Sequence, residues 1–242
     1  MVGVRKYIED PEKLIEVSFS GTKNIIAECK KSRARILFSS TSEIFGKNAS
    51  TPWSTSSNRV LGPTSVDRWV YSTSKALCEH LLFSLQKNDE IIMSIVRFFN
   101  VFGPRQSPIY LVSSAIDQAL RGKKPYLYDN GTATRCLTYI SDIICGIIKA
   151  ATIDEAIGNS FNIGNPREMT TKSIVILILK LCERLDLGFQ NINAQELYGK
   201  AYEDIPRRIP DIAKTQKLLD WSPVVSAEQG IKKTIDWAKT TI

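Results

Sequence analysis

Short apolar runs alternate with amphipathic segments in the first hundred residues of the chain. The runs at 35–38 and 91–99 have the length and composition of buried parallel strands. Between and before them, residues 11–31 and 72–86 are helical in pattern, and the second has an apolar stripe made of Ala76, Leu77, Leu81, Leu82 and Leu85. Because strands and helices alternate, the pattern predicts an α/β sheet.

The rest of the chain continues with shorter elements. We expect helices at 109–121, 171–185, 212–219 and 227–240, and strands at 125–128, 135–140 and 160–163. Ser226 and Gln229 have the spacing of a capping box at the start of the last helix. Asp142 precedes an apolar helical stretch and is expected to be its N-cap.

Composition indicates a globular protein and excludes several classes of site. The 242 residues are 43% hydrophobic, enough for one large or two small domains. No apolar stretch is long enough to span a bilayer, and the first ten residues lack the apolar region of a signal peptide, so we expect a cytoplasmic protein without a membrane partner. Five scattered cysteines and a single histidine, His80, argue against a disulfide framework and against a metal site.

The net charge of +7 raises the possibility of a nucleic-acid partner, with a basic cluster at residues 30–35. These cations follow the end of the helix predicted at 11–31, where the helix dipole favours them. A diphosphate-bearing small ligand also suits a basic protein. We therefore expect no nucleic-acid partner.

The first chemical constellation is Tyr71-x-x-x-Lys75, which a helix places on one face, one turn apart. An ammonium beside a phenol favours the phenolate; bringing its pKa from about 10 towards 7 requires roughly 4 kcal/mol of electrostatic support. Such a phenolate could remove a proton from a substrate hydroxyl. The spacing alone occurs by chance, so its interpretation depends on the surrounding sequence.

That surrounding sequence resembles the extended short-chain dehydrogenase/reductase family, the NAD-dependent epimerases and dehydratases that act on nucleotide sugars. A strand ending in a hydroxyl-rich segment precedes the Tyr-Lys pair, and a strand ending in Arg-Phe-Phe-Asn-Val-Phe-Gly-Pro-Arg follows it. Further similarities in the family's order lie at 135–142 (Arg-x-x-x-Tyr-x-x-Asp), 162–165 and 219–223.

Within this family, the sequence is most similar to the UDP-glucuronate decarboxylases. Thr41 occupies the position of the catalytic hydroxyl, and Ser42-Glu43 stands where the 4,6-dehydratases have Asp-Glu. A substrate carboxylate would be repelled by an aspartate, whereas a serine can donate a hydrogen bond to it. The stretches 61–71 and 198–210 resemble the decarboxylase half of the bifunctional enzyme of the aminoarabinose (polymyxin resistance) pathway.

The resemblance implies roles for individual residues. The implied catalytic residues are Thr41, Ser42, Glu43, Tyr71, Lys75 and Arg208, where Arg208 acts on the sugar carboxylate or in proton transfer. The implied contacts with NAD are Tyr71, Lys75 and Phe99, and those with the nucleotide sugar are Asn100, Arg135 and Tyr202. Glu43 could instead cap a helix or pair with a surface cation, and Arg135 and Arg97 could be structural.

The family's glycine-rich turn for the NAD pyrophosphate is not found. Glycine occurs in the first fifty residues only at positions 3, 21 and 46, and these form no such turn. The predicted fold is therefore a Rossmann-like parallel sheet lacking its N-terminal βαβ units, with a smaller C-terminal α+β substrate-binding subdomain. We expect the boundary at residues 104 and 105, with part of 135–165 returning to the sheet.

The expected function is oxidative decarboxylation of UDP-glucuronate to a UDP-4-keto-pentose or UDP-xylose, with NAD as cofactor. The resemblance also implies a homodimer or larger oligomer and a place in lipopolysaccharide synthesis. Three explanations of the missing cofactor site stay open: a truncated enzyme, an enzyme completed by a missing segment or partner chain, or a pseudoenzyme that binds UDP-sugar without turnover. A UDP-sugar 4-epimerase is a further alternative.

Overall fold

The computed structural model describes residues 9–193, 196 and 205–241, and the chain divides into two compact units. Unit 1 contains the described residues up to Phe99 together with Cys145–Ile163 and Pro210–Ser222. Unit 2 contains Asn100–Ile144, the described part of Gly164–Ile209, and the described residues from Pro223 onward. The chain therefore passes from unit 1 to unit 2 at Phe99, five residues before the boundary expected at residue 104.

Each unit has its own set of helices and strands. The elements of unit 1 are α2 (Pro11–Ser32), β1 (Ile36–Thr41), η1 (Ser42–Phe45), η2 (Asp67–Trp69), α3 (Val70–Lys87), β2 (Met93–Phe98), η4 (Asp154–Ala156), β7 (Ser160–Ile163) and α8 (Ala213–Leu219). The elements of unit 2 are β3 (Val101–Phe102), α4 (Leu111–Leu120), β4 (Tyr126–Tyr128), η3 (Asp129–Gly131), β5 (Thr134–Arg135), β6 (Thr138–Tyr139), β8 (Met169–Thr170), α6 (Thr171–Leu181), η5 (Leu185–Leu187), β9 (Gln190–Ile192) and α9 (Ala227–Lys239). The helix α5 (Ile140–Thr152) begins in unit 2 and ends in unit 1.

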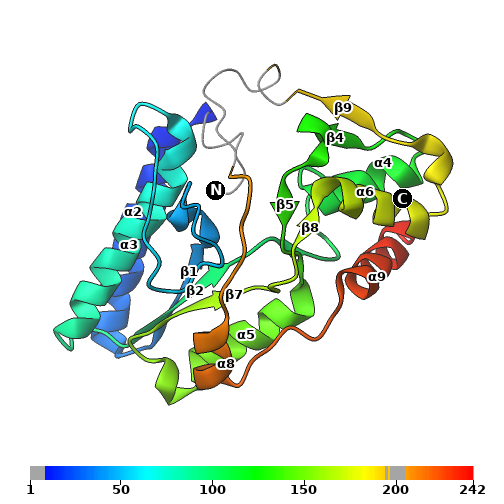
Figure 1. The fold of residues 1–242 in the computed structure, drawn as a ribbon. Helices are drawn as coiled ribbons and strands as arrows, with labels where there is room; N and C mark the ends of the chain where they lie inside the picture. Colours follow the sequence, from blue (N-terminus) through cyan, green and yellow to red (C-terminus); the bar gives the residue numbers. More distant parts are fainter. Residues whose placement is uncertain (1–8, 194–195, 197–204, 242) are drawn as a thin grey trace. The chain divides into compact units, whose positions relative to one another are not determined.

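Unit 1 is built on a parallel sheet with the strand order β1-β2-β7, which confirms the predicted α/β class. Helices α2 and α3 pack together along one face of this sheet (Figure 1). Their apolar faces and the strands form one buried cluster, made of Ile26, Ile36, Phe38, Cys78, Leu82, Ile91, Met93 and Ile95. Among the described residues, no strand pairs with the outer edge of β1.

Local sequence explains where the elements of unit 1 begin and end. Asp10 caps α2 by accepting a hydrogen bond from the backbone N of Lys13 (3.0 Å), and Pro11 occupies the first turn, where no N–H is needed. The helix ends at Arg33, which has a left-handed backbone conformation with φ 55°. At the end of β1, Thr41 caps η1 through its side-chain oxygen. The hydroxyl-rich segment that starts at Thr41 therefore follows directly from a buried strand.

Unit 2 is an α+β arrangement in which the helices α4, α6 and α9 accompany short strand pairs. Strands β3 and β6 pair in parallel, β4 and β9 pair in parallel, and β5 and β8 pair antiparallel. Its core lies among α4, α6 and α9, where Ala119, Ile174, Val175, Ile178 and Ile231 are fully buried. The capping box predicted at Ser226 and Gln229 is present at the start of α9.

Three local predictions are wrong. The strand expected at 135–140 is two separate strands, β5 and β6, because they pair with different partners, Met169–Thr170 and Val101–Phe102. The helix expected to reach residue 185 ends at Leu181, since Glu183 takes a left-handed conformation with φ 58°. Asp142 is not an N-cap; α5 begins before it, and its carboxylate accepts hydrogen bonds of 3.0 Å from the backbone N of Val224 and of Val225.

Remaining features of composition are placed as follows. Cys78, Cys136 and Cys182 are buried free thiols, whereas Cys145 and His80 are exposed. Burial raises the pKa of the Cys136 thiol to about 12. No helix in the described ranges is long and apolar enough to cross a bilayer, and no group of three or more potential metal ligands lies among the same residues.

Candidate functional site

The hydroxyl-rich segment predicted to react lies at the C-terminal end of β1 in unit 1. Thr41 is the last residue of the strand, and its Oγ1 accepts a hydrogen bond of 3.2 Å from the backbone N of Glu43. Ser42 and Glu43 begin η1, and all three side chains are nearly excluded from solvent. In open parallel sheets, ligands bind at the carboxyl ends of the strands, so this is the end where chemistry is expected.

Tyr71 and Lys75 lie one turn apart in α3, as their spacing predicts. Tyr71 is largely buried and packs against Leu14 of α2. Lys75 is half-buried; its Nζ donates a hydrogen bond of 2.9 Å to the carbonyl of Ser39 and lies 4.8 Å from the centre of the Phe38 ring. Burial lowers the pKa of Lys75, and the Cys78 and Glu79 side chains act in the opposite direction. Lys75 is thus placed against β1, whereas Tyr71 packs against α2.

Glu43 is held in a buried ion pair that the sequence did not indicate. Its Oε2 accepts a hydrogen bond of 2.7 Å from Nη1 of Arg68, a side chain that is only 1% exposed. Arg68 also lies against the ring of Trp69. An arginine partner favours the ionised form of a buried carboxylate, which suits an electrostatic role.

A second buried carboxylate, Glu79, joins three elements of unit 1. It accepts hydrogen bonds from Ser40 Oγ (2.5 Å), from Arg97 Nε (3.0 Å) and from Arg97 Nη2 (2.6 Å). Arg97 also donates to the carbonyl of Thr55 (2.8 Å), and its guanidinium lies over the Phe45 ring. For Arg97, the structural alternative left open by the sequence is the one observed.

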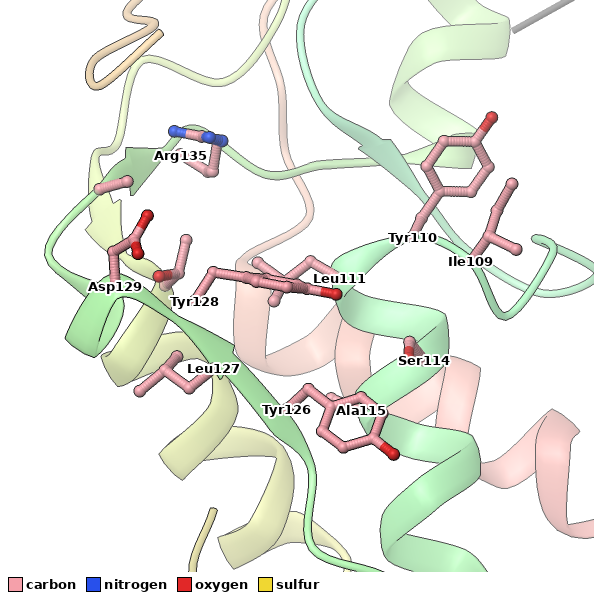
Figure 2. Close-up of a pocket in the computed structure, with 12 residues that line it drawn as sticks. Ile109, Tyr110, Leu111, Ser114, Ala115, Tyr126, Leu127, Tyr128, Asp129 and Arg135 are labelled. Carbon is pink, nitrogen blue, oxygen red and sulfur yellow. The ribbon is translucent and has the colours of Figure 1, made fainter. Parts of the chain in front are cut away.

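Unit 2 contains a pocket between α4 and β4 with an empty volume of about 800 Å³, part of it open to solvent. Figure 2 shows Arg135 and Asp129 on one side of this pocket and Ser114 and Tyr126 on the other. The complete lining is Ile109, Tyr110, Leu111, Ser114, Ala115, Tyr126, Leu127, Tyr128, Asp129, Ala133, Arg135 and Thr171. A mostly apolar, aromatic pocket with a cation is the usual form of a small-molecule site.

Arg135 is held in position by backbone carbonyls. Its Nη1 donates to the carbonyl oxygens of Thr134 (2.8 Å), Ile205 (3.2 Å) and Pro206 (3.4 Å). A guanidinium carries five N–H donors in a planar fork, so fixing one nitrogen orients the whole group. An oriented guanidinium in an aromatic pocket suits recognition of an anion such as a diphosphate.

Other predicted residues have separate positions. Asn100 belongs to unit 2, where its carbonyl accepts from the backbone N of Thr138 (3.1 Å) and its side-chain Oδ1 is buried without a donor among the described residues. Arg208 is buried in unit 2, whereas Phe99 belongs to unit 1 and is fully buried near Trp53. Tyr202 lies outside the described residues.

The segment that carries Arg208 is tied to the strands of unit 2 by an ion pair. Arg207 donates two hydrogen bonds of 2.8 Å to the carboxylate of Glu168, from Nε and from Nη2. Thr134 also donates to this carboxylate. These donors, with Arg207 the larger cause, lower the pKa of Glu168 to about 2. Arg207 therefore pairs with Glu168, and this contact is separate from the role predicted for the neighbouring Arg208.

Sequence reasoning missed Arg68 and Glu79. Both have positions that could have drawn attention, since Arg68 precedes Tyr71 by three residues and Glu79 follows Lys75 by four, spacings that place side chains on one helical face. Their partners, however, lie 25 and 18 residues away in sequence for the ion pairs, and only the fold brings them together.

The described residues lack one part of the family's NAD site. Tyr71 and Lys75, two of the expected contacts with NAD, lie one turn apart in α3. The glycines before Asn100 in the described ranges are Gly21 within α2, Gly46 after η1 and Gly62 in a loop, and none opens a helix after a strand. The described residues therefore contain no glycine-rich turn for a pyrophosphate.

Comparisons with known proteins identify the family of the chain. A family model described as GDP-mannose 4,6 dehydratase matches residues 1–234. A UDP-N-acetyl-alpha-D-glucosaminuronate decarboxylase of Bacillus cytotoxicus is 35% identical over 98% of this chain and 74% of its own length.

Solved structures show the same fold. The UDP-N-acetylglucosamine 4-epimerase of Methanobrevibacter ruminantium superposes with a TM-score of 0.89, at 22% identity over 100% of this chain and 75% of its own. The UDP-glucuronic acid 4-epimerase of Bacillus cereus, solved with UDP-glucuronic acid and NAD, gives a TM-score of 0.80 at 26% identity over 94% of this chain and 69% of its own. The chain belongs to the GDP-mannose 4,6-dehydratase family, a group of NAD-dependent epimerases, dehydratases and decarboxylases that modify nucleotide sugars.

Proposed function

We propose that this protein takes part in the oxidative decarboxylation of a UDP-hexuronate, in the first place UDP-glucuronate, to a UDP-4-keto-pentose or UDP-xylose. The observation that carries the proposal is the end of β1, where Thr41-Ser42-Glu43 meets the helix that bears Tyr71 and Lys75. Glu43 is paired there with Arg68, and Ser42 supplies a neutral donor. Such a site accommodates a substrate that carries its own carboxylate. A site with an aspartate in place of Ser42 would repel that carboxylate.

The proposed chemistry begins at the sugar 4-hydroxyl. Tyr71, supported by the Lys75 ammonium, takes the proton of this hydroxyl, and Thr41 donates a hydrogen bond to the same oxygen. NAD⁺, when bound, supplies the acceptor for the hydride that leaves C4. The resulting 4-keto acid has its carboxylate β to the carbonyl, so the C5–C6 bond breaks to release CO₂ while its electron pair moves onto the C4 carbonyl oxygen. A proton then adds at C5.

Charged residues are assigned to the carboxylate and to that proton. We assign Arg208 to the substrate carboxylate, since a guanidinium binds a carboxylate through two N–H groups. Glu43, kept in place by Arg68, shapes the site together with Arg208, and one of these two residues handles the proton that adds at C5. These roles remain predictions for each residue.

The pocket of unit 2 is assigned to the nucleotide half of the substrate. Tyr126 and Tyr128 offer aromatic surface for a base, and Arg135 offers oriented donors for the diphosphate. The buried Oδ1 of Asn100, which accepts no hydrogen bond from a described residue, would gain a donor from a bound sugar hydroxyl.

The relative from Bacillus cytotoxicus supports decarboxylation and widens the choice of sugar. The substrate in the name of this relative carries an N-acetyl group, so UDP-N-acetylglucosaminuronate is a second substrate to test. The structural similarity to the UDP-glucuronic acid 4-epimerase of Bacillus cereus favours 4-epimerisation as the second candidate function.

One experiment distinguishes these functions. The full chain is incubated with NAD⁺ and either UDP-hexuronate labelled with ¹⁴C at C6, and both released ¹⁴CO₂ and the remaining nucleotide sugars are measured. We expect ¹⁴CO₂ that is lost in Tyr71→Phe and retained in Thr73→Ala, an exposed position of the same helix turn. A 4-epimer without ¹⁴CO₂ would establish epimerisation instead. UDP-sugar binding without any turnover would indicate a binding protein and contradict the proposal.

A further inference from the structure

Consecutive residues of β1 contact successive turns of α3. The carbonyl of Ser39 accepts from Lys75 Nζ at 2.9 Å, and the hydroxyl of the next residue, Ser40, donates to Glu79 Oε1 at 2.5 Å. Lys75 and Glu79 are four residues apart and share one face of the helix. The strand residue after Ser40 is Thr41, so these two contacts set the position of α3 along the end of the strand.

Arg97 fixes Glu79 from the neighbouring strand. It lies directly opposite Ser40 in the parallel pairing of β1 with β2, and it meets the Glu79 carboxylate through Nε and Nη2. Glu79 and Arg97 are 5% and 6% exposed. Glu79 belongs to α3, and these contacts join its side chain to both β1 and β2.

We propose that Glu79 is a positioning residue that fixes the position of α3 against β1, and thereby holds Lys75 and Tyr71 beside Thr41. The inference that this position of α3 serves a reaction rests on the proposed function. The position itself can be tested without turnover, through the reactivity of Lys75. The hydrogen-bond partners of Glu79 in the described part of the chain are Ser40 and Arg97, neither of which is a candidate reacting group, so its effect is exerted through Lys75 and Ser40.

The charges around Glu79 agree with this role. Burial is the largest influence on the pKa of Lys75 and lowers it, while Cys78 and then Glu79 raise it. Arg59 is also near: burial lowers its pKa, Glu79 raises it and Arg97 lowers it. Glu79 is thus a carboxylate that interacts with several surrounding cations. Its removal changes the ionisation of Lys75 as well as the position of the Lys75 side chain.

A purely structural role makes a different prediction. Replacing a buried ion pair by apolar side chains of similar volume often preserves stability, whereas removing one partner leaves a buried charge unpaired. The double variant Glu79→Met/Arg97→Met can therefore keep the fold while it removes both contacts of Glu79 with its neighbours. If Glu79 only stabilises the fold, this variant should leave Lys75 as it is in the wild type.

The experiment measures the reactivity of each lysine in the full chain. The protein is treated briefly with an isotope-labelled amine-acylating reagent, and the labelled fraction at every lysine is determined by mass spectrometry. The variants are Glu79→Gln, Glu79→Met/Arg97→Met and Ser40→Ala, with melting temperatures recorded for each. Glu90→Gln is the matched control, since Glu90 pairs with exposed Lys30 at 2.5 Å.

We expect Lys75 to react about fivefold faster in Glu79→Gln. Removing a unit charge one helical turn away, in a high-dielectric environment, changes the ionisation equilibrium of an amine by about this factor. The increase should persist in the double variant even where its melting temperature equals that of the wild type. Glu90→Gln should affect Lys30 alone.

Unchanged reactivity of Lys75 in a folded Glu79→Gln variant, or its return to the wild-type value in the double variant, would overturn the proposal. Ser40→Ala keeps the ion pair with Arg97 and so decides the question where the Glu79 variants do not fold. Faster acylation of Lys75 in Ser40→Ala supports the positioning role of Glu79, and an unchanged rate refutes it. Loss of turnover with a normal Lys75 would bear on the proposed function only.

Discussion

The carboxylate of Glu43 lies 2.7 Å from Nη1 of Arg68, and the two side chains are 11% and 1% exposed. Glu43 follows the end of β1, and Arg68 stands three residues before Tyr71. The pair therefore links the hydroxyl-rich segment to the start of the helix that carries the Tyr-Lys pair.

Removing Arg68 should be costly. Arg68→Met retains most of the side-chain volume but leaves the buried Glu43 carboxylate without this partner, and we expect the free energy of unfolding to fall by about 3–5 kcal/mol. Urea denaturation gives the value. Lys31→Met is the control, because Lys31 pairs with Glu28 where both side chains are 72% exposed, and its loss should cost no more than about 1 kcal/mol. Equal effects of the two substitutions would contradict the importance of the buried pair.

The pocket of unit 2 makes a prediction about binding. Arg135→Gln should weaken the binding of UDP about 10- to 100-fold, the loss expected when charge-assisted hydrogen bonds to a phosphate are removed. Isothermal titration calorimetry with UDP measures it without a sugar or cofactor. The control is Arg121→Gln, which breaks a surface pair with Asp117 away from this pocket. An unchanged affinity in the Arg135 variant would remove that residue from the proposed site.

The pair formed by Glu168 and Arg207 predicts a dependence of stability on pH. The folded pKa of Glu168, about 2, lies below its ordinary value of 4.5 because Arg207 and Thr134 bond its charged form. The stabilisation is therefore fully present above pH 4.5 and is lost as the pH falls towards 2. Because solvent reaches this pair, we expect no more than about 1 kcal/mol.

Glu168→Gln provides the measurement for this pH dependence. The difference in unfolding free energy between wild type and variant should be constant from pH 7 to 5 and shrink below pH 4.5. A difference that grows as the pH falls would show that the sign is wrong.

Local patterns predicted the elements that carry the candidate site residues, and other elements of the sheet. The apolar stripe of 72–86 corresponds to α3, the run at 160–163 corresponds to β7, and the spacing of Tyr71 and Lys75 is the spacing of one helical turn in the structure. These features depend on residues close together in sequence, which is why periodicity and capping rules find them.

Features set by distant partners were not predictable in this way. Asp142 has the composition signal of a cap, yet its carboxylate bonds the backbone at Val224 and Val225, more than eighty residues away. The strand expected at 135–140 divides because its two ends pair with different segments. The ion pairs of Glu43 and Glu79 depend in the same way on how α3 meets the sheet.

Two glycines of unit 1 should respond to alanine in opposite directions. Gly46 follows η1 with φ 61°, and a Cβ built there would lie 2.1 Å from the carbonyl oxygen of Val60, a backbone atom that also accepts from Lys47 N. Gly46→Ala therefore requires the segment after Glu43 to move, and we expect a loss of about 1–3 kcal/mol in unfolding free energy. Gly21 lies inside α2 with nothing within 4 Å of a Cβ, so Gly21→Ala should stabilise by about 0.5–1 kcal/mol. Urea denaturation of both variants tests the pair, and a destabilising Gly21→Ala or a neutral Gly46→Ala would show that the backbone at that position differs from the structure.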